Sequence, residues 1–165
     1  MIRRFFILTT ISLLIGCSQT EYNVGDIPFD ERYDSPDFKV CNETKIEQYY
    51  IRASTDIAPG YQGEKKGLER EIIEAYNFPV TKNEDGYITI RFIVNCKGES
   101  GRFRIESMNF DYQEKSFDPN ITDQLLEIVK SLEGWIPRKR KGQNLDFYQY
   151  LTFRMEEGQI VKILP

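Results

Sequence analysis

The sequence predicts an α+β fold, an antiparallel sheet of three to four strands with two helices packed on one face. Residues 87–94 and 102–108 alternate apolar and polar side chains, which is typical of half-buried antiparallel strands. Residues 64–76 and 121–132 repeat apolar side chains every three or four positions, as amphipathic helices do. Tyrosines and phenylalanines crowd the strand-like segments, which also favours a sheet.

The first 16 residues have the features of a lipoprotein signal peptide. Arg3 and Arg4 precede an apolar run, 5–15, that is too short to cross a bilayer as a helix. The run ends in LIGC, which resembles a bacterial lipobox, so we expect cleavage before Cys17 and lipid attachment to its sulfur. Several acyl chains on one residue anchor a protein without embedding it. The alternative is a buried first helix with an incidental cysteine.

The rest of the chain divides into three segments. Residues 17–38 are polar, with scattered glycine, proline and acidic residues, and are predicted to form a flexible tether. Residues 39–63 are predicted to form an accessory layer and a turn, with short strands at 38–41 and 48–52. Residues 64–165 form the main domain. The 149 residues after the signal peptide suffice for one domain with a core.

Two cysteines remain after lipidation of the first. Because an exported compartment is oxidising, we expect a disulfide between Cys41 and Cys96. Two unpaired buried thiols are the alternative. Metal binding is the poorest interpretation, because the chain has no histidine to complete a zinc shell, and no metal or other cofactor is predicted.

Local signals place the predicted helices. The first follows a glycine-rich turn, begins near Glu64 and is stopped by Pro79. The second begins where Asp118 or Asn120 can cap it and Gly134 is expected to end it. Its apolar stripe, assigned to the core, comprises Ile121, Leu125, Ile128, Val129 and Leu132.

The strands form a hairpin and a long final segment. The first two strands join through a loop at 97–101, with Phe103 and Ile105 inward and Arg102, Arg104 and Glu106 outward. The last long strand alternates over 145–155, and 160–164 is predicted as a short fourth strand. In the last long strand, the inward residues are Leu145, Phe147, Leu151, Phe153 and Met155, and the outward residues are Asp146, Tyr148, Tyr150, Thr152 and Arg154.

A motif between the second helix and the last strand has a structural interpretation. Trp135 can close the end of the core, Pro137 forces an extended exit from the helix, and Gly142 permits the turn into the last strand. The order of a helix, the strand 86–94, a glycine hairpin, a second helix, this Trp-x-Pro motif and a strand with LTF at 151–153 resembles the TonB C-terminal domain family. The resemblance covers residues 64–155.

The resemblance implies function through contact with a partner. Energy-transducing members of that family bind a segment of an outer-membrane transporter by adding it as a strand to the sheet edge, and main-chain hydrogen bonds supply such binding. This chain has a lipobox in place of a membrane-spanning helix and lacks a long proline-rich spacer, so we do not expect it to transduce energy itself. We expect a protein anchored in the cell envelope, at the outer membrane and facing the periplasm.

Two surfaces are candidate contacts. The first is the edge and outer face of the last long strand, with Tyr148, Tyr150 and Arg154 as partner-binding residues; alternatively, these side chains merely flank a sheet. The second is the basic loop Arg138, Lys139, Arg140 and Lys141, which suits phosphates of lipid headgroups or an anionic cell wall. A solvated loop is the alternative there.

Other function classes have little support. Without residues 1–16 the chain carries 20 basic and 26 acidic residues, a net charge of −6 that disfavours nucleic acid. No histidine, nucleophile elbow or phosphate loop is present, so we do not expect an enzyme. A remote alternative is a hydrolase that uses two carboxylates among Glu106, Asp111, Asp118 and Asp123, although their spacing selects no pair.

Overall fold

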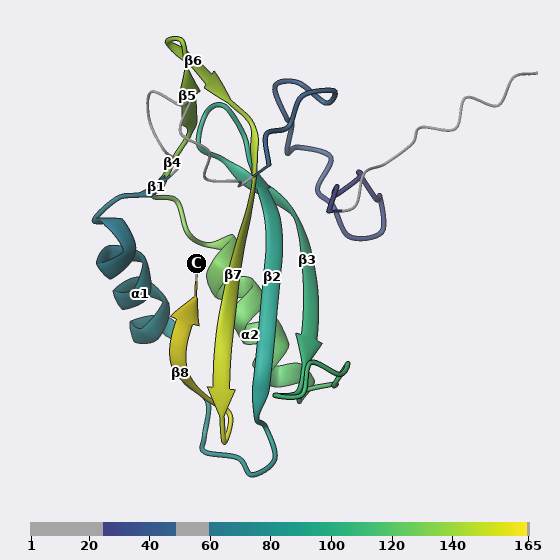
Figure 1. Cartoon of the computed structure of the whole chain (residues 1–165), viewed down its shortest axis with the longest axis vertical. Coiled ribbons are helices and arrows are strands. Elements are labelled where there is room, and N and C mark those ends of the chain that lie inside the picture. The colour runs from purple at the N-terminus through teal and green to yellow at the C-terminus, as the bar shows by residue number, and fades with distance from the viewer. Residues whose placement is uncertain (1–24, 49–59, 165) are drawn as a thin grey trace, which may run out of the picture.

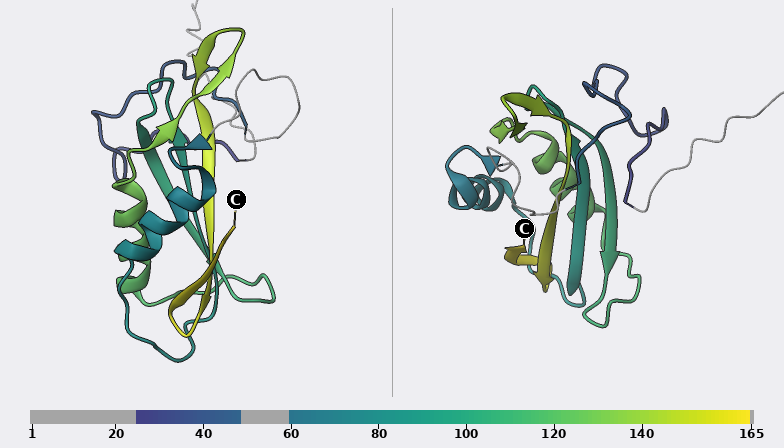
Figure 2. Two further views of the ribbon diagram at one scale, coloured as in Figure 1. Left: turned by 90° about the vertical axis from the view of Figure 1, so that its left-hand side faces the viewer. Right: turned by 45° about the horizontal axis from the view of Figure 1, so that its top comes forward.

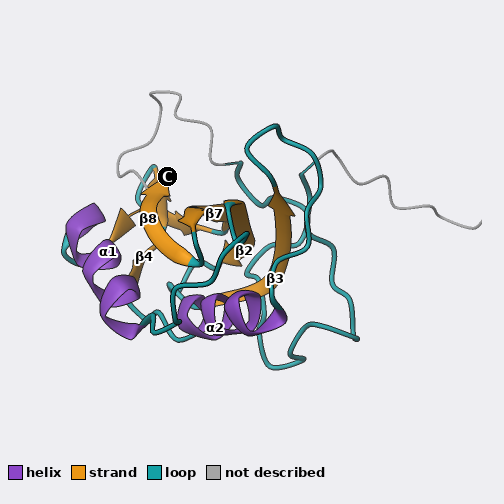
Figure 3. Cartoon of the chain, turned by 90° about the horizontal axis from the view of Figure 1, so that it is seen from below, coloured by secondary structure: helices purple, strands orange, loops and turns teal. Residues whose placement is uncertain are grey.

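The computed structural model describes residues 25–48 and 60–164. These residues form an α+β fold, in which a four-stranded antiparallel sheet of order β3-β2-β7-β8 carries both helices on one face (Figures 1 and 3). The elements are β2 (Gly86–Val94), β3 (Ser100–Met108), β7 (Phe147–Glu156), β8 (Gln159–Leu164), α1 (Glu64–Ala75) and α2 (Pro119–Lys130). The predicted fold class is confirmed at this level, including two helices and a short final strand.

Strand β2 lies inside the sheet, between β3 and β7, and its inward side chains are all apolar. Ile88, Ile90 and Phe92 are completely buried beneath the helices, and β3 and β7 pair with β2 on either side. The β2–β3 register shifts between Arg91 and Ile93, and the facing Arg102 has a φ of 57°. This β-bulge lies at the start of β3, and Arg102 still faces the outer side of the sheet together with Arg104, as predicted.

Helix α2 supplies most of the cover for the sheet. The Asp118 side chain accepts a hydrogen bond from the Asn120 N–H at 2.9 Å, and Pro119 occupies the first turn, as predicted. All five residues of the predicted stripe are buried in the core. The helix ends at Lys130 rather than at Gly134. Gly134 is needed for packing, because a Cβ there would lie 2.7 Å from the Tyr61 ring.

Two small strand pairs close one end of the molecule. β1 (Gly60–Tyr61) pairs with β4 (Trp135–Ile136), and β5 (Arg138–Arg140) forms a hairpin with β6 (Gln143–Leu145). Trp135 packs against Tyr61 and Phe92 with ring centroids 5.0 and 5.1 Å apart. Gly142 has a φ of 79° in the β5–β6 turn, a conformation that glycine adopts without strain. Trp135 and Gly142 therefore have the structural roles predicted from the motif.

Residues 25–48 cover part of the sheet, along its β3 side and against the outer face, which is the face away from the helices (Figures 1 and 2). Ile27 and Asp34 are buried there. The prediction of a flexible tether is therefore wrong for residues 25–38, since the arginines of β3 bind this segment. Residues 38–41 form no strand, so that accessory strand is also wrong. The signal peptide, Cys17 and residues 49–52 lie outside the described residues.

Candidate functional site

The predicted contact residues of β7 do not share one exposed surface. Tyr148 lies beside Asp26 and Ile27 in a cavity of about 280 Å³, and burial together with the Asp26 carboxylate raises the pKa of its hydroxyl. Tyr150 remains about one-third exposed. The Arg154 guanidinium donates to Glu156 at 2.7 Å and is also exposed. Segment 25–48 thus covers Tyr148, and only the other two predicted residues reach the surface.

The predicted binding edge of β7 is paired. β8 pairs with the half of β7 that runs from Thr152 to Glu156, and Glu47 forms an isolated bridge with Phe147 near the other end. The last segment of the chain therefore continues the sheet by one strand. The prediction that a partner adds to β7 is wrong, because β8 rather than β7 is the edge strand on this side.

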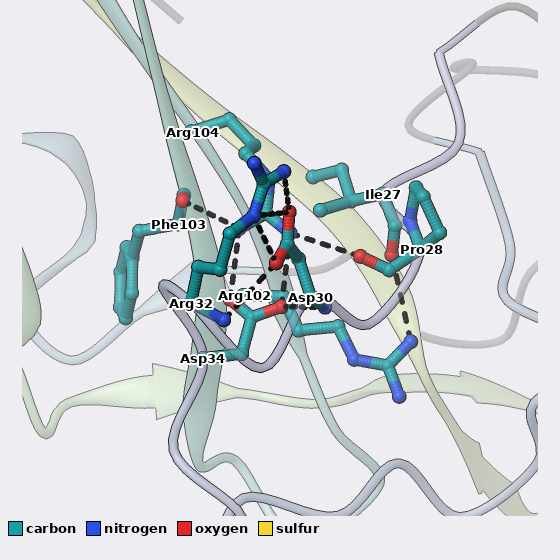
Figure 4. A network of polar contacts seen from close by, with 8 residues as sticks. All are labelled: Ile27, Pro28, Asp30, Arg32, Asp34, Arg102, Phe103 and Arg104. Carbon is teal, nitrogen blue, oxygen red and sulfur yellow. Dashed lines mark hydrogen bonds and ion pairs between the residues drawn. The ribbon is translucent and has the colours of Figure 1, made fainter.

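A network of ion pairs holds segment 25–48 on the sheet (Figure 4). Arg104 donates to both carboxylate oxygens of Asp34, at 2.8 and 2.9 Å, and to the carbonyl of Pro28 at 2.9 Å. Arg102 pairs with Glu43 in the same segment. Burial alone would raise the pKa of Asp34, but the bonds from Arg104 and from the Asp30 N–H lower it. Apart from Arg102 Nε, which has no hydrogen-bond partner among the described residues, these groups bind one another, so the network fastens the segment to the sheet.

The predicted disulfide between Cys41 and Cys96 is present, and Asp146 supports it. The buried Asp146 carboxylate accepts hydrogen bonds from the N–H groups of Asn42 at 2.7 Å and Cys96 at 2.8 Å. Asp146 was predicted to point outward, but its carboxylate instead joins the two cysteine-bearing segments. In the described part of the chain, Cys41, Cys96 and Asp146 are the one group of three potential metal ligands that lie close together, and their sulfurs are bonded to each other.

The basic loop uses half of its cations within the fold. Arg138 is buried and donates to the Gln48 carbonyl at 2.8 Å. Arg140 forms two bonds of 2.8 Å with the Glu47 carboxylate. Lys139 is half-buried and Lys141 is exposed in the turn. The prediction of a four-cation surface is therefore wrong for the two arginines.

A pocket opens between α1 and the β7–β8 side of the sheet. Its volume is about 240 Å³, which suits one or two side chains rather than a larger ligand. Leu68 of α1, Leu151 of β7 and Ile163 of β8 give it apolar walls, and Lys65 and Glu69 of α1 also line it. Tyr61, Trp135 and Gln149 also line the pocket. The pocket and the edge strand β8 thus share one side of the molecule.

Two lining residues have unused polar atoms. Trp135 Nε1 and Gln149 Oε1 are buried, and neither has a hydrogen-bond partner in residues 25–48 and 60–164. A buried indole N–H and a buried amide oxygen ordinarily find partners, so each of these atoms leaves a hydrogen bond unmade beside the pocket. Gln149 was the available sequence signal, because it is a polar residue at an inward position between Phe147 and Leu151.

Tyr61 joins the wall of this pocket to helix α1. Its hydroxyl bonds the Glu71 carboxylate at 2.6 Å, and burial, reinforced by that carboxylate, raises its pKa to about 12. The tyrosine therefore stays protonated at neutral pH and acts as a hydrogen-bond donor to Glu71. Because Glu71 lies in the second half of α1, this bond ties the helix to β1 beside the pocket.

The carboxylates considered for hydrolysis lie outside both cavities. Glu106 pairs with Arg91 at 3.0 Å, and Asp118 caps α2. Asp111 and Asp123 are exposed, in the loop after β3 and on α2. None of the four lines the pocket beside β8 or the cavity beside Tyr148.

Comparison with family models, curated proteins and solved structures found no match for this chain. None of the helices in the described residues is long and apolar enough to span a membrane.

Proposed function

We propose that this chain is a lipid-anchored, non-catalytic protein of the cell envelope whose α+β domain binds a peptide segment of another envelope protein along β8. The observation that carries the proposal is the position of an edge strand beside an apolar pocket. In the described ranges, β8 pairs only with β7, and no second strand pairs with its other side. Strand addition needs main-chain groups and a pocket for alternate side chains, and no reactive residue.

The pocket gives such a segment a means of selection. A partner strand beside β8 would run next to Ile163 and Leu164, which line the pocket. An apolar side chain of the partner would fill the space between Leu68 and Leu151, and a polar group beside it would satisfy Trp135 Nε1 or Gln149 Oε1. A partner that brings both an apolar side chain and a polar group would therefore bind more tightly than a partner that brings only one of them.

The resemblance to the TonB C-terminal domain supports the same mode of binding, with the strand moved from β7 to β8. The lipobox at Cys17 supports an envelope location, at the outer membrane and facing the periplasm. The alternative, binding of lipid headgroups or cell wall through the basic loop, is weaker, because Arg138 and Arg140 already have partners within the fold.

Photo-crosslinking in intact cells tests this proposal. A photoreactive residue in place of Val161, which is exposed on β8, is expected to capture one defined segment of a partner protein. The matched control carries the photoreactive residue in place of the exposed Lys45, outside the sheet. Capture of the same proteins from both positions, or none from Val161, would refute partner binding at β8.

A further inference from the structure

Four exposed aromatic side chains gather on the side of the molecule that bears β3. Phe29 and Tyr33, in segment 25–48, are 48% and 70% exposed, and Phe110 and Tyr112, in the loop after β3, are 41% and 76% exposed. Both segments lie at the β3 edge, opposite α1 and β8 (Figure 1). Among the described residues, the exposed aliphatic side chains Ile73, Val80, Ile136 and Val161 come from other elements. Of the exposed aromatic side chains in the described residues, only Tyr150, on β7, lies outside these two segments.

Contacts with the sheet hold these rings in place. Arg102 and Arg104 lie over the rings of Phe29 and Tyr33, at 5.7 and 5.9 Å from the centroids. At the other end of β3, Tyr87 stacks on Tyr112 with centroids 5.9 Å apart. Phe110 packs edge-on against Tyr87, at 5.4 Å, and beneath Arg154. The rings therefore form a fixed surface that loses little side-chain entropy on binding.

The same side carries Gly25, the first residue that the structure describes. The Arg91 guanidinium donates to the Gly25 carbonyl, which places Gly25 against the outer face of the sheet. Gly25 lies eight positions after Cys17 in the sequence, and a chain of that length spans at most about 29 Å even when fully extended. Strand β7, with ten residues, is itself about 33 Å long. A lipid on Cys17 would keep this side of the domain within one strand length of the bilayer.

We propose that the β3 side is a membrane-contact surface, in which Phe29, Tyr33, Phe110 and Tyr112 rest in the headgroup region of the membrane that holds the anchor. The inference rests on the lipid anchor of the proposed function. Tyrosine is enriched at membrane–water interfaces because its ring is apolar and its hydroxyl is polar. Exposed acidic residues nearby, including Glu31, Asp111 and Glu114, indicate contact through the rings instead of attraction to anionic lipid. This orientation directs β8 and its pocket away from the membrane.

The test uses the full lipidated protein in phosphatidylcholine vesicles with brominated acyl chains. Tyr112→Trp places a fluorescent reporter on the proposed surface, and Val161→Trp places a matched reporter on β8, which is also exposed. The unsubstituted protein supplies the signal of the buried Trp135 for subtraction. We expect bromine to quench the emission of the Tyr112→Trp reporter and to leave that of the Val161→Trp reporter almost unchanged.

Mass spectrometry of the N-terminal fragment tests the lipid anchor on Cys17 separately from the orientation of the domain. If Cys17 carries lipid and both reporters are quenched equally, or only the one on β8, the proposed orientation is overturned while the anchor stands. If Cys17 carries no lipid, the anchor and the orientation that depends on it are both overturned. Quenching confined to Tyr112→Trp in lipidated protein supports both.

Discussion

Arg104 and Asp34, which are 70 residues apart in the sequence, form a two-pronged ion pair with N–O distances of 2.8 and 2.9 Å. The carboxylate is almost fully buried, with 2% of its side chain exposed. The pair joins the outer face of β3 to segment 25–48, of which residues 25–38 were predicted to belong to a flexible tether. The attachment of segment 25–48 to the outer face therefore depends on a few charged contacts.

Replacement of Asp34 by asparagine should lower the free energy of unfolding by about 2 kcal/mol, because hydrogen bonds to a charged partner are lost. The Arg154–Glu156 pair is a matched control, since both side chains are nearly half exposed. Glu156→Gln should cost less than about 1 kcal/mol. Urea denaturation of both variants checks this, and equal losses would show that the Asp34 pair has no special role.

The same pair predicts how stability depends on pH. The folded state lowers the pKa of Asp34, so its carboxylate stabilises the protein fully above the ordinary aspartate pKa of about 3.9. That contribution is lost as the pH falls through the lowered pKa of the folded state. The stability difference between the wild type and Asp34→Asn should be constant from about pH 5 to 7 and shrink below about pH 4. A difference that grows in acid would contradict this assignment.

The sheet and helices could be predicted because their signals are local. The alternation of Ile88, Ile90 and Phe92 defines one buried face, and Asp118 with Pro119 marks the start of α2. Segment 25–38 has no such periodicity. Its position depends on Arg104 meeting Asp34 across the fold, and sequence spacing contains no information about that contact.

The disulfide should make a large contribution to stability. Replacing both Cys41 and Cys96 by serine should lower the free energy of unfolding by about 4 kcal/mol, since the bond closes a loop with a sequence separation of 55. Chemical denaturation with and without a reductant measures this for the wild type. The serine variant should be insensitive to the reductant, and a wild type that is equally insensitive would indicate that the bond does not form.

The basic loop contains arginines that bind groups within the fold and a lysine that is exposed to solvent. Arg140→Gln breaks two charge-assisted bonds to Glu47 and should destabilise the protein by about 1.5 kcal/mol. Lys141→Gln changes an exposed turn residue and should alter the free energy of unfolding by less than about 0.5 kcal/mol. Thermal or urea unfolding distinguishes them. A larger loss for Lys141→Gln would contradict these roles.

The candidate site was less predictable than the fold. Leu68, Leu151 and Trp135 all match core patterns, and nothing in those patterns shows that α1 leaves a pocket between them. The short last strand was predicted at 160–164, but its pairing beside β7, which decides which edge of the sheet stays open, does not follow from a pattern of six residues. Gln149 is the exception, since its polarity at an inward position indicates an unsatisfied site.

Backbone hydrogen exchange tests the binding mode most directly. The segment captured from Val161 would be synthesised as a peptide and added to the protein, and exchange would be followed for each strand. If the peptide adds to the sheet, amides in β8 should exchange more slowly, because their outward groups gain partners, while β3 should be unchanged. Protection confined to β3 or to the basic loop, or no protection on binding, would contradict strand addition at β8.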